Sequence, residues 1–219
     1  MAEADDAELR ADVVAAVRRL DARGLNRGST GNLSARAADG GAWITPTGMG
    51  AAGLEADDLA WIALDGDAQR GRWQASSEAP FHRAIYRARA DLNAVVHVHS
   101  THATALAALR RRLPPFHYMV AVAGGDDVPC VPYHLFGSAA LSEAVACAFA
   151  DRDACLLANH GLVAGGATLE RALKVTEEIE SLCASYLAAL AAGEPALLSA
   201  AEMAEVRERF RYYGRSERA

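Results

Sequence analysis

The sequence predicts one α/β domain in which helices flank a mixed, mostly antiparallel β-sheet. The chain has 219 residues, of which 52% are hydrophobic and 23% charged, and this is enough for a single sizeable core. Short apolar runs alternate with helical segments, but without the regular βαβ period of a parallel sheet. Two short strands expected close together in residues 42–64 favour antiparallel pairing. We expect the domain to span residues 1–219, with a mobile C-terminal tail from about residue 211.

Helices are predicted from apolar residues at helical spacing, from alanine-rich segments and from end signals. Gly24 is placed to end the first helix, and Ser77 to cap the first amides of the second. Thr168 opens a long helix, and Ser199 with Glu202 fits a capping box for the last one. In chain order, the predicted helices cover residues 7–22, 76–88, 102–109, 139–149, 168–190 and 199–210.

Strands are predicted where short apolar or β-branched runs are bounded by turn residues. The clearest is the run Ala94-Val95-Val96-His97-Val98-His99. Three glycines, two asparagines and small hydroxyl residues predict a loop over residues 24–34. Four prolines and a Gly-Gly pair predict irregular structure or short strands over residues 110–137. In chain order, the predicted strands cover residues 42–45, 61–64, 94–99 and 154–159.

Composition limits the classes of function. The formal net charge is −6 and no basic stripe occurs, so nucleic acid is not an expected partner. No apolar run reaches about 18 residues and the acidic N-terminus has no apolar core, so neither a membrane span nor a signal peptide is expected. The four cysteines form no Cys-x-x-Cys pair, which favours reduced, buried thiols in a cytoplasmic protein.

Three histidines suggest a metal site. His97 and His99 lie two residues apart on a predicted strand, so their side chains point to the same face. His160 follows another apolar run. Three neutral imidazoles would leave a zinc ion with an open coordination position, as catalysis requires. Taken alone, a His-x-His pair is more often two satisfied polar residues, but the third histidine and the hydrophobic strand favour a metal.

A carboxylate at a helix start is the main candidate for proton transfer. Glu78 would be stabilised there by the helix dipole alone, or it would act as a general base beside the metal. His82, four residues later, would share its helix face. That pair is either half of a metal-binding arrangement or an ordinary surface or supporting pair.

Segments rich in small hydroxyl residues resemble anion-binding loops. Ser29, Thr30 and Asn32 lie in the glycine-rich loop, and Ser76 and Ser77 precede a helix, where backbone amides favour anions. The segment Thr45-Pro46-Thr47-Gly48 is a third candidate. Each segment alone is more often a simple turn, but three together favour a phosphorylated substrate.

These motifs together resemble the class II aldolase/adducin head family and, within it, the fuculose-phosphate branch. The likeness runs from about residue 8 to Gly214, and the pair Ser29-Thr30 departs from that of many relatives. The matching segments are Gly31-Asn32-Leu33-Ser34, Ile44-Thr45-Pro46-Thr47-Gly48, Ser76-Ser77-Glu78, Phe81-His82, Asn93 to His99, His117-Tyr118-Met119, Gly124-Gly125, Pro129 to Tyr133, and Asn159-His160-Gly161-Leu162.

The resemblance implies a three-layer fold and a site for each group. One zinc ion per chain would be held by His97, His99 and His160, with Glu78 as fourth ligand and acid/base. A neighbouring subunit would supply Tyr118 as a proton donor to the aldehyde. Tyr213, or the adjacent Tyr212, would help to close the site, in a homotetramer with sites between subunits. The residues implied to hold the substrate phosphate are Ser29, Asn32, Thr47, Gly48, Ser76 and Ser77.

The implied activity is zinc-dependent cleavage of a ketose 1-phosphate, similar to L-fuculose 1-phosphate, into dihydroxyacetone phosphate and a short aldehyde such as lactaldehyde. The single lysine, Lys174, lies in a predicted helix, which argues against a Schiff-base aldolase. Alternatives in the same family are a pentulose-phosphate 4-epimerase, a sugar-acid-phosphate decarboxylase, and an aldolase for 5-deoxy or methylthio pentulose phosphates. A non-catalytic adducin-like interaction module is a further alternative, but such modules lack the metal ligands.

Overall fold

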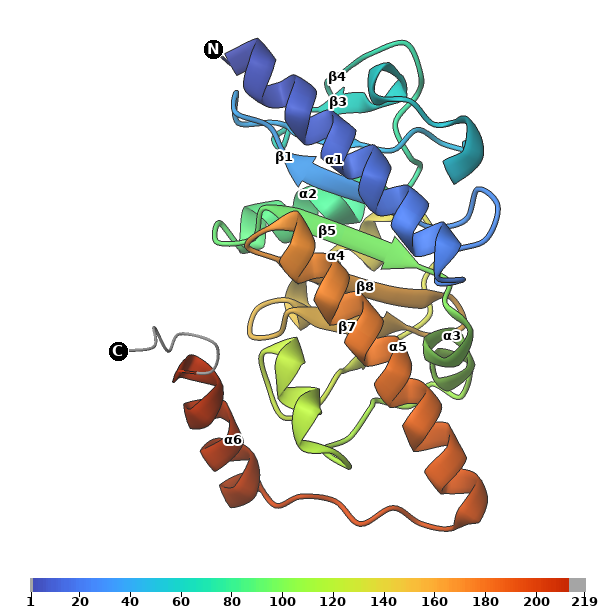
Figure 1. Cartoon of the computed structure of the whole chain (residues 1–219), viewed down its shortest axis with the longest axis vertical. Coiled ribbons are helices and arrows are strands. Elements are labelled where there is room, and N and C mark those ends of the chain that lie inside the picture. The colour runs from blue at the N-terminus through green and yellow to red at the C-terminus, as the bar shows by residue number, and fades with distance from the viewer. Residues whose placement is uncertain (1, 213–219) are drawn as a thin grey trace.

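A mixed β-sheet of eight strands forms the centre of the computed structural model, which describes residues 2–212 (Figure 1). The strands lie in the order β4-β3-β2-β1-β5-β8-β7-β6. All neighbours are antiparallel except β6 and β7, so the predicted fold class is confirmed. The strands are β1 (Asn32–Arg36), β2 (Ala42–Ile44), β3 (Ala60–Ile62), β4 (Gln69–Arg70), β5 (Ala94–Val98), β6 (Cys130–Val131), β7 (Ala154–Leu157) and β8 (Gly161–Gly166).

Helices cover both faces of the sheet and give three layers (Figure 1). One hydrophobic cluster joins the sheet to α1, α3, η3 and α5, and a second joins the opposite face to α2 and α4. No helix within residues 2–212 combines the length and the apolarity that crossing a bilayer requires. The helices are α1 (Ala2–Ala22), η1 (Ala51–Gly53), η2 (Ala56–Asp58), α2 (Ala79–Ala88), α3 (Thr101–Ala108), η3 (Tyr118–Ala123), α4 (Ala139–Ala148), α5 (Leu169–Ala192) and α6 (Ala200–Tyr212).

The centre of the sheet brings distant segments together. Strand β5 is buried along its whole length and pairs with β1 on one side and β8 on the other. In this register Asn32 lies opposite His97 on one side, and Val163 lies opposite His97 on the other. The candidate residues that follow β5 and precede β8 therefore meet at one end of the sheet.

Helix ends largely follow the predicted signals. Gly24 has a φ of 69° just beyond α1, and the Thr168 hydroxyl caps α5 by accepting from Arg171 N–H. Ser199 and Glu202 form the expected reciprocal bonds at the start of α6. The expected Ser77 cap is wrong: α2 begins after Glu78 without a side-chain cap, because the nearby Ser76 hydroxyl accepts from Glu78 N–H instead.

Three strands, β1, β4 and β8, were not predicted, and two thiols are not fully buried. Residues 32–34 were expected in a loop, but they belong to β1 because they pair with β5. Strand β8 contains three glycines, which are poor strand signals, yet it is completely buried between β5 and β7. All four cysteines are free, but Cys147 is exposed on α4 and Cys130 is only partly buried, so the expectation of buried thiols holds for Cys155 and Cys183 alone.

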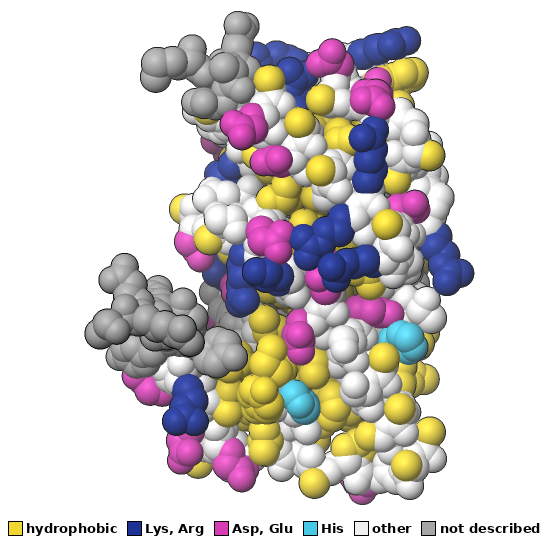
Figure 2. Space-filling model, in the orientation of Figure 1, with side chains coloured by type: hydrophobic (Ala, Val, Ile, Leu, Met, Phe, Trp, Pro, Cys, Tyr) yellow, Lys and Arg dark blue, Asp and Glu magenta, His cyan; other side chains and the backbone are white. Residues whose placement is uncertain are grey.

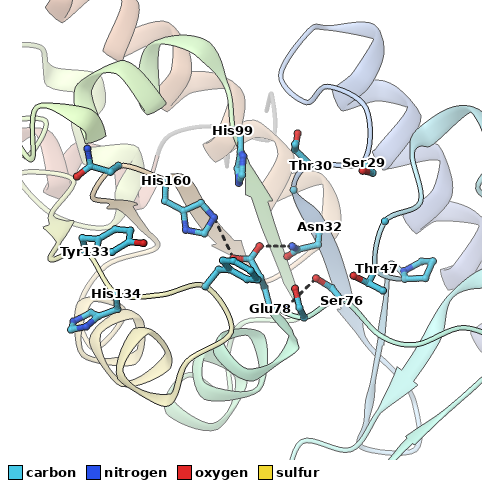
Figure 3. Close-up of a pocket in the computed structure, with 16 residues that line it drawn as sticks. Ser29, Thr30, Asn32, Thr47, Ser76, Glu78, His99, Tyr133, His134 and His160 are labelled. Carbon is cyan, nitrogen blue, oxygen red and sulfur yellow. Dashed lines mark hydrogen bonds and ion pairs between the residues drawn. The ribbon is translucent and has the colours of Figure 1, made fainter.

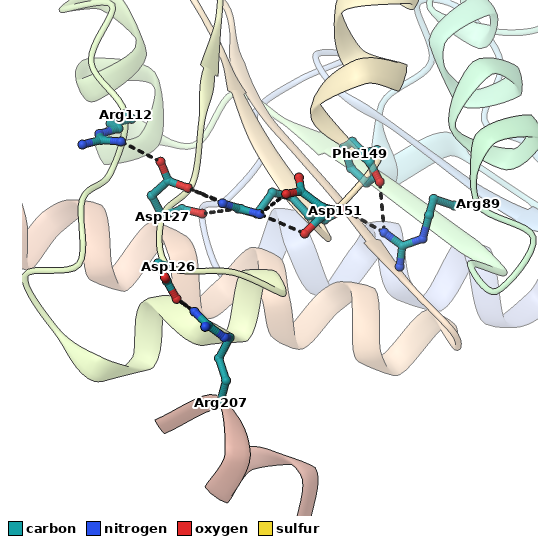
Figure 4. A network of polar contacts seen from close by, with 8 residues as sticks. Arg89, Arg112, Asp126, Asp127, Phe149, Asp151 and Arg207 are labelled. Carbon is teal, nitrogen blue, oxygen red and sulfur yellow. Dashed lines mark hydrogen bonds and ion pairs between the residues drawn. The ribbon is translucent and has the colours of Figure 1, made fainter. Parts of the chain in front are cut away.

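Ion pairs tie the C-terminal helix to the body of the protein (Figure 4). Arg207 on α6 pairs with Asp126, in the loop that follows η3. The adjacent Asp127 carboxylate bridges Arg112 and Arg152, at 3.2 Å and 3.0 Å. The Arg207–Asp126 pair therefore joins α6 to the loop after η3, and Asp127 ties that loop to Arg112 and Arg152. Helix α6 lies beside η3, at the end of the extended segment that follows α5 in Figure 1.

Candidate functional site

Three histidines and one glutamate converge at the end of the central strands. Among the described residues, Glu78, His97, His99 and His160 each offer a ligand atom, and these atoms lie within 4.8 Å of one another. His97 Nε2 is 3.0 Å from His99 Nε2 and 3.2 Å from Glu78 Oε2, and His160 Nε2 is 3.3 Å from Glu78 Oε1. We call these four residues the His–Glu cluster.

The sheet itself directs the first histidine. His97 is fully buried in β5, and its Nδ1–H donates to the carbonyl oxygen of Leu162 at 3.0 Å. The Nε2 lone pair is therefore turned toward the cluster. Gly161 makes room for this arrangement, because a Cβ there would collide with the Val98 carbonyl oxygen and press on the His97 and His99 rings.

A left-handed residue positions His160. Asn159 has a φ of 56°, a conformation that asparagine tolerates better than most residues. Its N–H donates to Ala107 O at 3.1 Å, and its side-chain oxygen accepts from Arg110 Nε at 2.9 Å. The tight turn between β7 and β8 is thus fixed, and it carries His160 into the cluster.

A largely buried carboxylate anchors the chain directly after His99. Glu180 on α5 accepts from Ser100 Oγ at 2.6 Å and from the N–H groups of His102 and Ala103 at 2.9 Å and 2.8 Å. Burial would raise the pKa of Glu180, but these hydrogen bonds lower it below its ordinary value. An anion from another helix therefore caps α3 and holds the backbone beside His99.

The electrostatics of the cluster suit a divalent cation. Burial would raise the pKa of Glu78, but its polar contacts with His97, His160 and the Asn32 amide lower it to about 2. Burial and the neighbouring histidines lower the pKa of His99 and of His160 to about 4. Near neutral pH the carboxylate is therefore charged and these imidazoles are neutral, as metal binding requires.

One oxygen of the cluster has no hydrogen bond of its own. Glu78 Oε1 is buried, and its 3.3 Å contact with His160 lacks the geometry of a hydrogen bond. A buried carboxylate oxygen without a donor is costly unless a cation is nearby. Three imidazoles with one carboxylate match the ligand types of zinc. The residues present therefore fit a bound metal ion.

His82 lies behind the cluster and is neither a ligand nor a surface residue. Its ring is fully buried, and burial lowers its pKa to about 3. Its Nε2 is 2.5 Å from Asn32 Oδ1, and the Asn32 amide nitrogen donates to Glu78 Oε2 at 2.8 Å. Of the two interpretations of His82, the supporting one agrees with this position.

A pocket of about 330 Å³ opens beside the cluster (Figure 3). It is lined by Glu78, His99 and His160, and it has both polar and apolar walls. The residues expected to contact phosphate also line it, although the Asn32 amide nitrogen is already bonded to Glu78. Those residues are Ser29, Asn32, Thr47, Gly48, Ser76 and Ser77.

Sequence reasoning assigned no role to one wall of this pocket. Tyr133, His134 and Phe136 line it, and Tyr133 and Phe136 are 53% and 61% exposed. Solvent-exposed aromatic residues in a loop were the available signal, but exposure is not visible in a sequence. Asn159 also lines the pocket, next to His160.

Of the tyrosines predicted to be functional, Tyr118 does not line this pocket within its own chain. Tyr118 is about half exposed and lines a separate hollow of about 730 Å³ with Met119, Lys174 and Phe210. Figure 2 shows hydrophobic side chains gathered on this face below a group of basic ones. Tyr213 lies outside the described residues, and Tyr212 ends α6.

Comparisons with known proteins show the family of this chain. Residues 11–187 match the family described as Class II Aldolase and Adducin N-terminal domain. The 5-methylthioribulose-1-phosphate/5-deoxyribulose-1-phosphate aldolase of Rhodospirillum rubrum is 46% identical over 206 residues, which is 94% of this chain and 92% of that protein. The L-fuculose phosphate aldolase of Escherichia coli K12 is 46% identical over 192 residues, covering 87% of this chain and 88% of that protein.

A solved structure shares the fold closely. A structure named L-fuculose 1-phosphate aldolase superposes with a TM-score of 0.89 at 35% identity, over 93% of this chain and 96% of that one. Sequence match, fold and site geometry thus point the same way, and the chain belongs to the Class II Aldolase and Adducin N-terminal domain family.

Proposed function

We propose that this protein is a zinc-dependent lyase that cleaves a ketose 1-phosphate into dihydroxyacetone phosphate and a short aldehyde. The observation that carries the proposal is the His–Glu cluster at the wall of a pocket rimmed by small hydroxyl residues. The relatives named above are aldolases of sugar phosphates. An L-fuculose 1-phosphate-like substrate, giving lactaldehyde, is the first candidate.

The proposed roles follow from charge and position. Zinc held by His97, His99, His160 and Glu78 would supply a Lewis acid for the negative charge that bond cleavage leaves on the ketose fragment. Glu78 is the one carboxylate of the cluster, and its low pKa keeps it deprotonated near neutral pH, the form that can accept a proton. In this proposal it holds and returns the proton at the carbon next to the ketone.

The rim of the pocket is proposed to bind the substrate phosphate. Ser76 and Ser77 precede α2, whose N-terminus carries a partial positive charge. Thr47 and Gly48 form a turn on the facing side, where Gly48 has a φ of 71°. With Ser29 they surround the pocket with hydroxyl groups and backbone amides, which are the donors that a phosphate accepts.

The position of Tyr118 supports a shared site. Tyr118 lines a hollow separate from the pocket that holds His99 and His160. We therefore assign Tyr118 to the site of a neighbouring subunit in a homotetramer, as the proton donor to the aldehyde oxygen, with Tyr213 closing that site. Mixing Tyr118→Phe protein with Glu78→Gln protein should regenerate wild-type sites and activity. No recovery despite demonstrated subunit exchange would contradict the assignment.

A second substrate has specific support. The relative from Rhodospirillum rubrum is named for 5-methylthioribulose 1-phosphate and 5-deoxyribulose 1-phosphate. Tyr133 and Phe136 offer exposed aromatic surface on the pocket wall, which suits a methyl or methylthio end of a sugar. These two phosphates are therefore the alternative substrates for the same reaction.

Product analysis with a panel of ketose 1-phosphates tests the proposal. Purified, zinc-loaded protein should release dihydroxyacetone phosphate from L-fuculose 1-phosphate or from the 5-deoxy and 5-methylthio pentulose phosphates, and a Glu78→Gln control should release far less. An epimer formed without carbon–carbon cleavage would identify a 4-epimerase instead. Carbon dioxide from a phosphorylated sugar acid would identify a decarboxylase. Zinc binding without turnover of any member would favour a non-catalytic module.

A further inference from the structure

A chain of buried polar side chains runs from the His–Glu cluster into the core, between β1 and α2. Asn32 and Ser34 lie two residues apart on β1, so their side chains share one face. Glu78, His82 and Tyr86 recur every four residues at the start of α2 and along it, so they also share one face. Strand and helix side chains alternate along the chain, and all five are less than 9% exposed.

Each pair of neighbouring side chains in this chain lies within hydrogen-bond distance. Asn32 Nδ2 is 2.8 Å from Glu78 Oε2, and Asn32 Oδ1 is 2.5 Å from His82 Nε2. Ser34 Oγ is 2.7 Å from His82 Nδ1 and 2.8 Å from the Tyr86 hydroxyl. The chain is thus continuous from the carboxylate to the tyrosine.

The protons in this chain can be ordered in one consistent direction. A carboxylate only accepts, so Asn32 must present its NH₂ group to Glu78 and its oxygen to His82. His82 must then donate from Nε2, and its Nδ1 accepts from the Ser34 hydroxyl. The Ser34 oxygen in turn accepts from the Tyr86 hydroxyl.

The orientation of Glu78 in the His–Glu cluster depends on which way the Asn32 amide is turned. A reversed amide would bring its oxygen against Glu78 Oε2, where two acceptors repel each other. With the observed orientation, Oε2 is held by Asn32 while Oε1, which has no hydrogen bond, faces His160. Because the Asn32 amide cannot rotate, Glu78 keeps its Oε1 atom directed toward the other metal-binding atoms.

We propose that His82, backed by Ser34 and Tyr86, is a positioning residue that locks the Asn32 amide toward Glu78 and so orients this carboxylate for the metal. The consequence for turnover rests on the proposed function, because it assumes that Glu78 acts in the reaction. The consequence for zinc affinity and for the His82 tautomer does not need the cleavage reaction.

Two matched amide variants test the proposal in the full-length, zinc-loaded protein. His82→Gln places an NH₂ group near the position of Nε2 and can still donate to Asn32, whereas His82→Asn reaches only the position of Nδ1, beside Ser34. Both remove the same fully buried imidazole, so both should lower the melting temperature to a similar extent. Loss of a supporting contact at a metal ligand typically costs 10- to 100-fold in metal affinity or activity.

We expect His82→Asn to lose about 10- to 100-fold in zinc affinity, measured by competition with a chelator, and a similar factor in kcat with little change in KM. His82→Gln should remain within about threefold of wild type in zinc affinity and in kcat, because its amide can still donate to Asn32. Equal losses in the two variants, in step with their melting temperatures, would reduce His82 to a packing role and overturn the proposal.

A direct measurement on the wild-type protein keeps the test independent of the variants. Nitrogen NMR of ¹⁵N-histidine-labelled, zinc-loaded protein should show His82 protonated at Nε2 and bare at Nδ1. A proton on Nδ1 would reverse the chain and overturn the proposal, even if both variants failed to fold. Absence of cleavage of every ketose phosphate would remove the proposed function, while zinc affinity and tautomer would still decide the role of His82.

Discussion

The two sides of the pocket are built differently. On one side, the His–Glu cluster is buried or half-buried and is held from behind: Leu162 fixes His97, Asn32 fixes Glu78, and Glu180 anchors the backbone after His99. On the other side, the rim and the aromatic wall lie in loops, and Ser77 and Phe136 are exposed.

This difference separates the chemistry from the choice of substrate. Buried ligands with fixed partners are pre-organised, so they suit the step that relatives with different substrates have in common. Loop residues on a rigid scaffold can change without disturbing the sheet, so they suit recognition. Damage to the cluster should therefore reduce turnover, whereas damage to the rim should alter KM and substrate preference.

The largest effect is expected from the loss of a histidine in the cluster. His99→Ala should bind zinc much more weakly and lose on the order of 10³-fold in kcat, because a Lewis acid supplies several kcal/mol of stabilisation. Metal content by mass spectrometry and a cleavage assay would be read on the same sample. His134→Ala, at the pocket wall, is the matched control and should keep its metal. Full activity in a metal-free His99→Ala protein would break the comparison.

The next effect concerns the carboxylate. Glu78→Gln should preserve the fold but lose about 10²- to 10⁴-fold in kcat, because a carboxamide cannot accept the proton. Steady-state kinetics at saturating zinc would separate this loss from weaker metal binding. A variant within about twofold of wild type would leave Glu78 with only its position at the start of α2.

A smaller effect of a different kind is expected at the rim. Ser77→Ala should raise KM for the phosphorylated ketose by roughly tenfold or more with little change in kcat, since a hydrogen bond to a charged group contributes about 1.5–3 kcal/mol. KM for the unphosphorylated ketose should not change. Ser185→Ala on α5, whose hydroxyl bonds within its own helix, is the control. Equal changes in KM for the two substrates would show that Ser77 does not bind the phosphate.

The smallest effect is expected when the pH is lowered. The pKa values of His99 and His160 are lowered from 6.5 to about 4 in the folded chain, so the unfolded chain binds protons first as the pH falls. In the metal-free protein, the contribution of these histidines to the free energy of unfolding should therefore be fully present above pH 6.5. It should be lost as the pH falls from 6.5 to 4. Thermal unfolding should show this slope in wild type and a shallower one in His99→Gln. A melting temperature independent of pH over this window would contradict the buried, neutral state of these histidines.

The sequence predicted the features of this molecule that depend on residues close together along the chain. Apolar spacing and end signals located the helices, and the His-x-His spacing on a β-branched run is sufficient to place two cluster residues on one face of a strand. The convergence of Glu78 and His160 with that pair depends on strand order, which a single sequence does not encode locally. The residues raised it only as a hypothesis, and the family resemblance implied it.

The parts that were missed depend on pairing and burial. Glycines in β8 and the polar Asn32 and Ser34 in β1 are poor strand signals, and these segments are strands because β5 lies beside them. The role of His82 was left open, because only the packing of α2 against β1 shows that it contacts Asn32 rather than solvent. The exposed wall formed by Tyr133 and Phe136 was missed for the same reason.

Zinc binding to the wild-type chain tests the central claim most directly. Metal-stripped protein would be titrated with zinc while cleavage and the X-ray absorption spectrum are followed on the same samples. We predict that activity rises linearly to one zinc per chain and then stops, with a spectrum of three imidazole nitrogens and oxygen ligands around the metal. Full activity before any zinc is added, or a metal site without imidazole ligands, would contradict the claim that the His–Glu cluster is the catalytic metal centre.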